Sequence, residues 1–176
     1  LARYKYTANQ ALSGGYTSTY RFGEDYSNIV NSVDAYFRPV DPLSIQAQYI
    51  NSLTQYSADI ASNFSQPVNN FSGHAFYGQS EYDTRQYQSS LTYVYRDRGL
   101  RTDAGFITQV DVKGFNFFAR KKIWSEGKPW FTRFFITTGG SRFENLAGLE
   151  SSSQIYGALS YLGPLQTQIN LQYYPF

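Results

Sequence analysis

The chain has 176 residues, with 15 Lys and Arg against 13 Asp and Glu, so its formal charge is close to neutral. A nearly neutral chain without a run of five basic residues is not expected to bind nucleic acid. No apolar run reaches the ~20 residues of a membrane-spanning helix, and the absence of cysteine excludes disulfides and cysteine-bound metals.

Aromatic residues are the outlying feature of the composition. The 17 Tyr, 14 Phe and 2 Trp make up 19% of the chain. Tyr and Trp combine an apolar ring with a polar tip, which suits the boundary between water and lipid. A tyrosine-rich soluble β-sandwich would have the same composition. The aromatic content alone therefore does not distinguish a membrane protein from a soluble sandwich.

Alternation of apolar and polar residues predicts about ten β-strands. In segment 28–38, Ile29, Val33 and Phe37 share one face, and mostly polar residues occupy the other. We expect strands at 1–8, 13–22, 28–38, 43–57, 74–83, 86–97, 106–120, 129–143, 150–162 and 164–174. Short joins such as 83–86 predict antiparallel neighbours, because a parallel crossover needs about a dozen residues.

Two longer links lie at 59–73 and 97–105, and no helical pattern of ten residues is found. Short turns combined with longer loops are typical of an outer-membrane barrel. No linker divides the chain, so residues 1–176 are expected to form a single module.

The polar face of the strands favours a membrane barrel over a soluble sandwich. It carries mainly Gln, Asn, Ser, Thr and Tyr, which suit a confined aqueous lumen, where a solvated sheet would carry many Lys and Glu. Aromatic residues also gather at strand ends, as at Tyr93 and Tyr95 or Trp130 and Phe131. Outer-membrane barrels place such aromatic girdles at both membrane surfaces. We therefore expect an all-β, antiparallel up-and-down transmembrane β-barrel in the outer membrane of a Gram-negative-type bacterium.

The middle of the chain carries a family resemblance. Residues 100–107 read Leu-Arg-Thr-Asp-Ala-Gly-Phe-Ile, followed by Gln109 and Asp111. With RYKYTANQALSGGYTSTYR, VDAYFR and LSIQAQYINS earlier in the chain, this stretch resembles a bacterial family. Its members join a domain like carbohydrate-binding module family 9 to a C-terminal outer-membrane barrel of uncharacterised function. Leu100 departs from the family, which usually has an aromatic residue there. The resemblance implies an interior section of a larger barrel, so we expect an open sheet whose edges pair with chain outside these residues.

The densest group of mixed charges is a candidate site at the lumen or the rim of the barrel. It consists of Asp97, Arg98, Arg101, Asp103 and Asp111. One interpretation is a solvated loop whose charges tie it to the rim. The other is a charged constriction that selects what passes through the lumen.

A second candidate site is a basic cluster among aromatic residues: Arg120, Lys121, Lys122, Trp124 and Trp130. Such a cluster would contact lipid phosphates or lipopolysaccharide at the membrane surface. Alternatively, it is a strand end whose long side chains reach into water.

Catalysis is not expected. His74 is the only histidine, and Ser72 lies two positions before it. In a strand their Cα atoms would stand ~6.5 Å apart, a poor spacing for a nucleophile and its base. A lone imidazole also does not make a metal site, so no enzyme and no cofactor are predicted.

The sequence thus predicts a porin-like channel or scaffold wall that functions in transport, surrounded by membrane lipid or lipopolysaccharide. A first alternative is a membrane anchor that displays a glycan-binding domain, with or without a partner protein of a larger outer-membrane complex. A second alternative is an outer-membrane lipid hydrolase.

Overall fold

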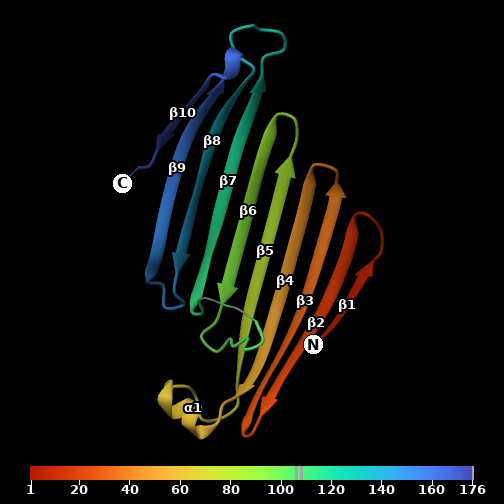
Figure 1. Cartoon of the computed structure of the whole chain (residues 1–176), viewed down its shortest axis with the longest axis vertical. Helices are drawn as coiled ribbons and strands as arrows, with labels where there is room; N and C mark the ends of the chain where they lie inside the picture. The colour runs from red at the N-terminus through yellow and green to blue at the C-terminus, as the bar shows by residue number, and fades with distance from the viewer. Residues whose placement is uncertain (106, 108, 176) are drawn as a thin grey trace.

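The computed structural model describes residues 1–105, 107 and 109–175. Ten strands form one antiparallel sheet, in which each strand pairs with its neighbours in sequence (Figure 1). The strands are β1 (Ala2–Thr7), β2 (Leu12–Gly23), β3 (Tyr26–Val40), β4 (Leu43–Gln55), β5 (Phe71–Asp83), β6 (Tyr87–Arg96), β7 (Val112–Trp124), β8 (Arg133–Glu144), β9 (Glu150–Leu162) and β10 (Gln168–Tyr173). This confirms the expected all-β, up-and-down antiparallel architecture.

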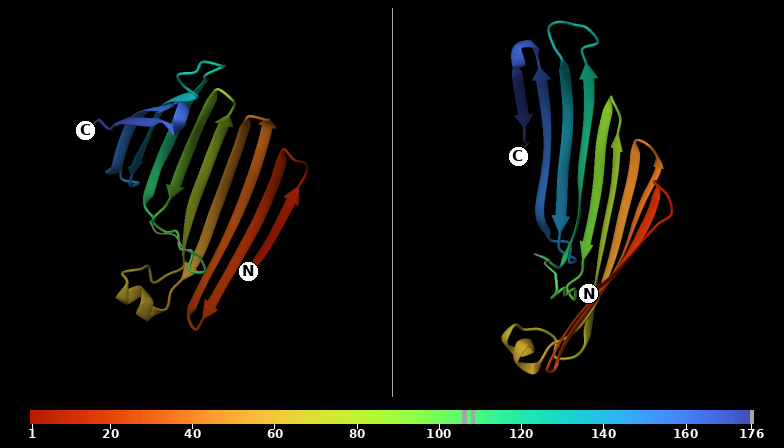
Figure 2. Two further views of the ribbon diagram at one scale, coloured as in Figure 1. Left: turned by 45° about the horizontal axis from the view of Figure 1, so that its top comes forward. Right: turned by 45° about the vertical axis from the view of Figure 1, so that its right-hand side comes forward.

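The sheet is curved and open (Figure 2). β1 and β10 lie at opposite edges, and no pairing joins them in the described part of the chain. The open sheet agrees with the expectation from the sequence. One irregularity interrupts the ladder between β3 and β4, where the register shifts between Phe37 and Val40. Pro39 lies within this step, and a proline has no N–H to donate to the ladder.

Several strand boundaries differ from those predicted; for example, β8 begins at Arg133 and not at residue 129, and β7 continues to Trp124 and not only to residue 120. β7 begins at Val112 and not at residue 106, because the preceding residues form a loop; positions 106 and 108 lie outside the described residues. β10 is shortened at its start, because Pro164–Gln166 forms a 3-10 turn with Leu165 at φ 54°. The link 59–73 contains a short helix, α1 (Ala58–Asn63), which the sequence pattern did not reveal.

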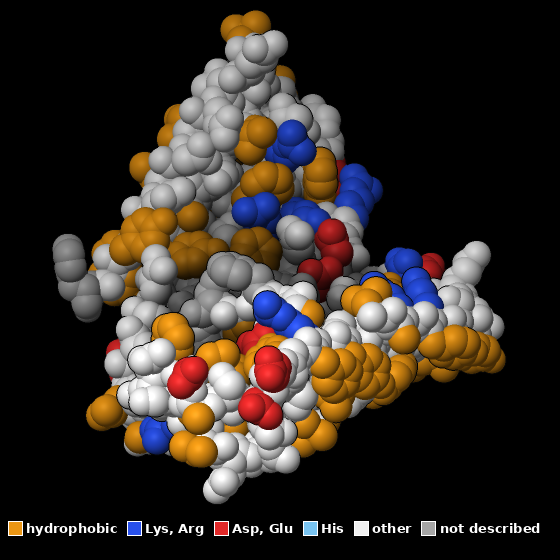
Figure 3. Space-filling model, turned by 60° about the horizontal axis from the view of Figure 1, so that its bottom comes forward, with side chains coloured by type: hydrophobic (Ala, Val, Ile, Leu, Met, Phe, Trp, Pro, Cys, Tyr) orange, Lys and Arg blue, Asp and Glu red, His pale blue; other side chains and the backbone are white. Residues whose placement is uncertain are grey.

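The alternation of side chains gives the sheet two unlike faces. We call the face that Leu100, Arg101 and Asp103 cover the inner face and the opposite one the outward face. On β3 the inner positions Asn28, Val30 and Ser32 are buried, whereas the outward positions Val33 and Phe37 are exposed. Charged side chains gather in the hollow of the curved sheet, and hydrophobic ones line its border (Figure 3).

In the described part of the chain, α1 and the 3-10 turn are too short to cross a bilayer as helices.

Candidate functional site

The loop between β6 and β7, described at residues 97–105, 107 and 109–111 and called loop 97–111 below, folds over the inner face of the sheet. Its deepest residue is Leu100, which is 1% exposed and lies against Gly73 of β5. A Cβ atom added to Gly73 would overlap the backbone of Leu100, so only glycine permits this approach. The next residue, Arg101, donates its backbone N–H to Ser52 Oγ on β4 at 3.1 Å. The loop therefore crosses from one strand to the next.

Asn28 on β3 fixes the middle of the loop. Its Nδ2 atom donates to the backbone oxygen of Arg101 at 3.1 Å and to Thr54 Oγ1 at 2.9 Å. Its Oδ1 atom accepts from the backbone N–H of Asp103 at 3.1 Å. The side chain is 1% exposed. A buried amide with all these partners satisfied holds the loop in a defined position, because losing any one of them would leave a buried polar group unpaired.

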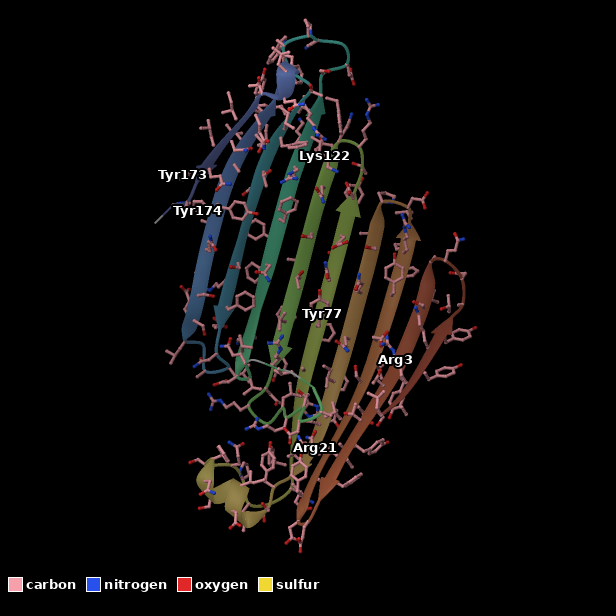
Figure 4. All side chains as sticks on the ribbon, viewed as in Figure 1. Arg3, Arg21, Tyr77, Lys122, Tyr173 and Tyr174 are labelled. Atoms are coloured by element: carbon pink, nitrogen blue, oxygen red, sulfur yellow. The ribbon has the colours of Figure 1, made fainter. Side chains whose placement is uncertain are left out.

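Asp103 anchors the far end of the loop beside β2 and β3. Its carboxylate accepts from the hydroxyls of Tyr26 at 2.6 Å and Tyr56 at 3.3 Å. Arg21, labelled in Figure 4, donates from Nη1 to the backbone oxygen of Asp103 at 3.0 Å. Burial, and secondly the negative charge of Asp103, raise the pKa of the Tyr56 phenol. The hydroxyl therefore stays protonated and keeps its role as donor.

Arg101 joins the loop to the link that contains α1. Its Nε atom donates to Gln66 Oε1 at 3.2 Å, and its Nη1 atom donates to the backbone oxygens of Arg98 and Leu100. The guanidinium also lies over the ring of Phe71, 5.6 Å from its centre. The loop 97–111 and the link that contains α1 thus form one connected structure at this end of the sheet.

The base of the loop is held by the remaining candidates. Asp97 accepts from the backbone N–H groups of His74 at 2.8 Å and Gly99 at 2.9 Å. Arg98 forms an ion pair with Asp111 at 3.0 Å. Asp111 also accepts from the N–H of Leu146 at 3.1 Å, which links the loop to the turn after β8. The Arg98 contact, followed by the Leu146 bond, lowers the pKa of Asp111.

The mixed-charge group of the sequence therefore lies on one loop, where its members make separate attachments along the loop. A cavity of about 450 Å³ lies beside the far end of the loop. It is lined by Arg21, Tyr26, Tyr56, Ile60, Phe64, Gln66, Arg101 and Asp103. The tyrosines and Asn28 could not be singled out from the sequence, because their roles depend on a loop distant in the chain.

The basic cluster of the sequence is divided between the two faces. Arg120 and Lys122 belong to the inner face, and Lys122 (labelled in Figure 4) forms an ion pair with Asp83 at 2.5 Å. Lys121 points outward and lies near the ring of Tyr87. Trp124 donates its ring N–H to the backbone oxygen of Arg85 at 2.7 Å, which fixes it at the sheet end.

Trp130 lies separately, in the turn between β7 and β8. It is exposed and packs on Phe131, with ring centres 4.4 Å apart. Because successive residues of β7 point to opposite faces, these basic residues do not form the single surface that their closeness in the sequence suggests.

His74 points to the outward face. Its Nδ1 atom lies 2.6 Å from the hydroxyl of Tyr49 and 3.3 Å from Nδ2 of Asn51, both on β4. Ser72 shares that face, and no hydrogen bond between Ser72 and His74 is found in the described residues. Within the same residues, no group of three or more His, Cys, Asp or Glu side chains is placed to hold a metal ion.

No known protein family, curated protein or solved structure matches this chain, so the family resemblance carried by residues 89–115 and the earlier segments stays a prediction.

Proposed function

We propose that this chain forms part of the wall of a non-enzymatic outer-membrane β-barrel channel. In this proposal the outward face contacts lipid and the inner face borders an aqueous lumen. The loop 97–111, together with the α1 link, narrows that lumen near one end of the strands. The observation that carries the proposal is the distribution of exposed apolar side chains over the two faces.

Every strand carries exposed, large apolar side chains on its outward face. Examples are Tyr4, Tyr16, Val33, Tyr49, Phe76, Leu91, Phe115, Ile136, Ile155 and Ile169, one from each strand in order. No strand residue of this kind lies on the inner face in the described part of the chain; Val40, after the register shift in β3, pairs with Leu43 and so shares the outward face. A soluble monomer rarely exposes contiguous apolar patches of more than a few hundred Å². A continuous outward surface of this kind is expected where lipid is the solvent.

The charges on the outward face mark the limits of this apolar surface. Lys113 lies at one end of β7, where it pairs with Glu144 at 3.1 Å, and Lys121 lies towards the other end. Between them the outward positions are Phe115, Phe117 and Ala119. The two lysines are separated by about 26 Å along the strand, close to the ~25 Å apolar band of outer-membrane barrels.

The loop on the inner face favours a channel over a simple anchor. An anchor needs only the outward surface, whereas the loop attachments at Asn28, Ser52 and Asp103 lie where a lumen would be. The lipid-hydrolase alternative has less support, since His74 is held by Tyr49 and Asn51 and makes no bond to Ser72 in the described residues.

Two measurements on the full-length protein test this proposal. It is expected to require detergent for solubility and to show heat-modifiable mobility on gels. A monodisperse monomer in plain buffer would contradict the membrane assignment.

In planar bilayers the full-length protein is expected to give discrete conductance steps. Replacing residues 98–104 by a short Gly-Ser turn is expected to increase the conductance, whereas replacing turn residues 126–128 by Gly and Ser is the matched control. A correctly inserted protein without conductance would favour the anchor.

A further inference from the structure

The inner face carries more basic than acidic side chains. The basic residues on its strands include Arg3, Lys5, Arg21, Arg96, Arg120, Lys122 and Arg133. The acidic residues on the described inner strand positions are Asp34, Glu81 and Asp83. This imbalance is not visible in the composition, where the two signs nearly cancel. It appears only when the strand register assigns each charge to a face.

Of the basic strand residues named above, only Lys122 forms an ion pair with a described residue, and two of the others, Arg120 and Arg133, lie on the neighbouring strands β7 and β8. Arg120 on β7 donates from Nε to Thr137 Oγ1 at 3.1 Å, and Arg133 on β8 makes no hydrogen bond through its buried Nε atom within the described residues. Neither takes part in an ion pair with a described residue, whereas the neighbouring Lys122 is paired with Asp83.

Both guanidinium groups lie near the same aromatic ring. The guanidinium carbons of Arg120 and Arg133 lie 5.1 Å and 5.9 Å from the ring centre of Phe135. Arg120 also lies 5.1 Å from the ring centre of Phe118. Contacts between a cation and a ring fix the position of the charge without neutralising it. The two groups therefore form a preorganised positive site on the inner face.

From this arrangement we infer that the lumen prefers anions and that Arg120 and Arg133 form an anion-binding site on its wall. This inference rests on the proposed channel function. A guanidinium stays charged at every physiological pH, and its fork of N–H donors fits carboxylate and phosphate oxygens. Charged side chains that line a pore select ions of the opposite sign, and a wall of low dielectric constant strengthens the field. The ligands are small anions such as chloride, phosphate and carboxylates.

The expected effect follows from Coulomb's law. In water, one unit charge at ~7 Å changes the local concentration of a monovalent anion about threefold. Removing both charges is therefore expected to lower the ratio of anion to cation permeability by at least about threefold. Salt screens such charges, so the effect should be larger at low ionic strength.

The test is the reversal potential of the full-length protein in planar bilayers under a gradient of KCl. The native protein is expected to pass chloride more readily than potassium. The double variant Arg120→Gln/Arg133→Gln should lose most of this preference, whereas Arg120→Lys/Arg133→Lys should keep it, because the charge is retained. The matched control is Lys121→Gln, which removes a charge of the same sign one residue away on the outward face.

The outcomes separate this inference from the channel proposal. Conductance without a preference for chloride, or an unchanged preference in the Gln double variant, overturns the anion site and leaves the channel intact. A correctly inserted native protein without any conductance overturns both. If the Gln variant fails to insert, the selectivity of the native protein and of the Lys variant decides the question.

Discussion

Replacing Leu91 by arginine is expected to destabilise the protein in a membrane far more than the same change at the next residue. Leu91 lies near the middle of β6, points outward and is 51% exposed. Its neighbours across the sheet are Ser80 on β5 and Phe117 on β7. Thr92, the adjacent residue, pairs with Gln79 on the polar inner face. The two positions therefore share their strand and depth and differ only in the face.

The magnitude follows from the position of Leu91 along the strand. It lies about 13–17 Å from either end of β6 at ~3.3 Å per residue, which places it near the centre of a ~25 Å apolar band. Arginine on the lipid face at this depth costs about 2–4 kcal/mol of the free energy of unfolding. On a soluble protein, a substitution at an exposed position usually changes this free energy by less than ~0.5 kcal/mol. The Leu91→Arg result thus distinguishes a lipid-facing from a water-facing surface.

The assay is reversible unfolding by urea in lipid vesicles, followed through tryptophan fluorescence. Leu91→Arg should shift the unfolding midpoint to lower urea, and Thr92→Arg should leave it nearly unchanged. Equal destabilisation by the two variants would refute the assignment of the faces. A cost below ~0.5 kcal/mol for Leu91→Arg would refute the presence of lipid at that surface.

Two further predictions concern the loop. Gly73→Ala is expected to push Leu100 away from the inner face and to increase cleavage of the loop by trypsin, with a cost of about 1–3 kcal/mol. Gly157→Ala is its control, because a Cβ atom there meets nothing closer than 4.0 Å; equal cleavage in both variants would contradict this packing. Arg98 lowers the pKa of Asp111, so this attachment is fully present above the ordinary carboxylate pKa and is lost as the pH falls through the lowered value. Cleavage by an acid protease should rise over that range in the native chain, and a rate that does not change with pH would contradict the prediction.

Much of the fold could be predicted because period-two alternation is a local signal. The strand Tyr26–Val40 shows it within its own residues, and the turn at Asp41 and Pro42 leaves only an antiparallel return. The start of β7 could not be predicted in this way. Leu100 packs on Gly73, and the backbone of Arg101 and Asp103 is hydrogen-bonded to Asn28, so these residues attach to other strands instead of extending the ladder. A pattern within one segment does not reveal which distant surface satisfies its backbone groups.

The candidate site was predicted only in part for a similar reason. Charge density identified Asp103 and Arg101, since charged residues stand out in a chain with few charges. The partners of Asp103, Tyr26 and Tyr56, belong to a large set of tyrosines, and nothing in their local sequence separates them from the others. The unpaired guanidinium of Arg133 was also missed. Its significance depends on the positions of Phe135 and Arg120 in the register between β7 and β8.

The loop attachments also have a consequence for the order of folding. All strand pairings join neighbours in sequence, whereas Asp103 contacts Asn28, Tyr26 and Arg21 over separations of 75, 77 and 82 residues. Closing a loop costs more entropy as it lengthens, and contacts that are distant in sequence form more slowly. We therefore expect the hairpins to pair first and the loop to dock last. Pulse-labelling hydrogen exchange would show this as late protection of the Asp103 amide, and protection at the same time as the ladder amides would refute the order. During assembly the inner face would thus stay uncovered until the loop docks, and the loop can dock only when the strands that hold it are in place.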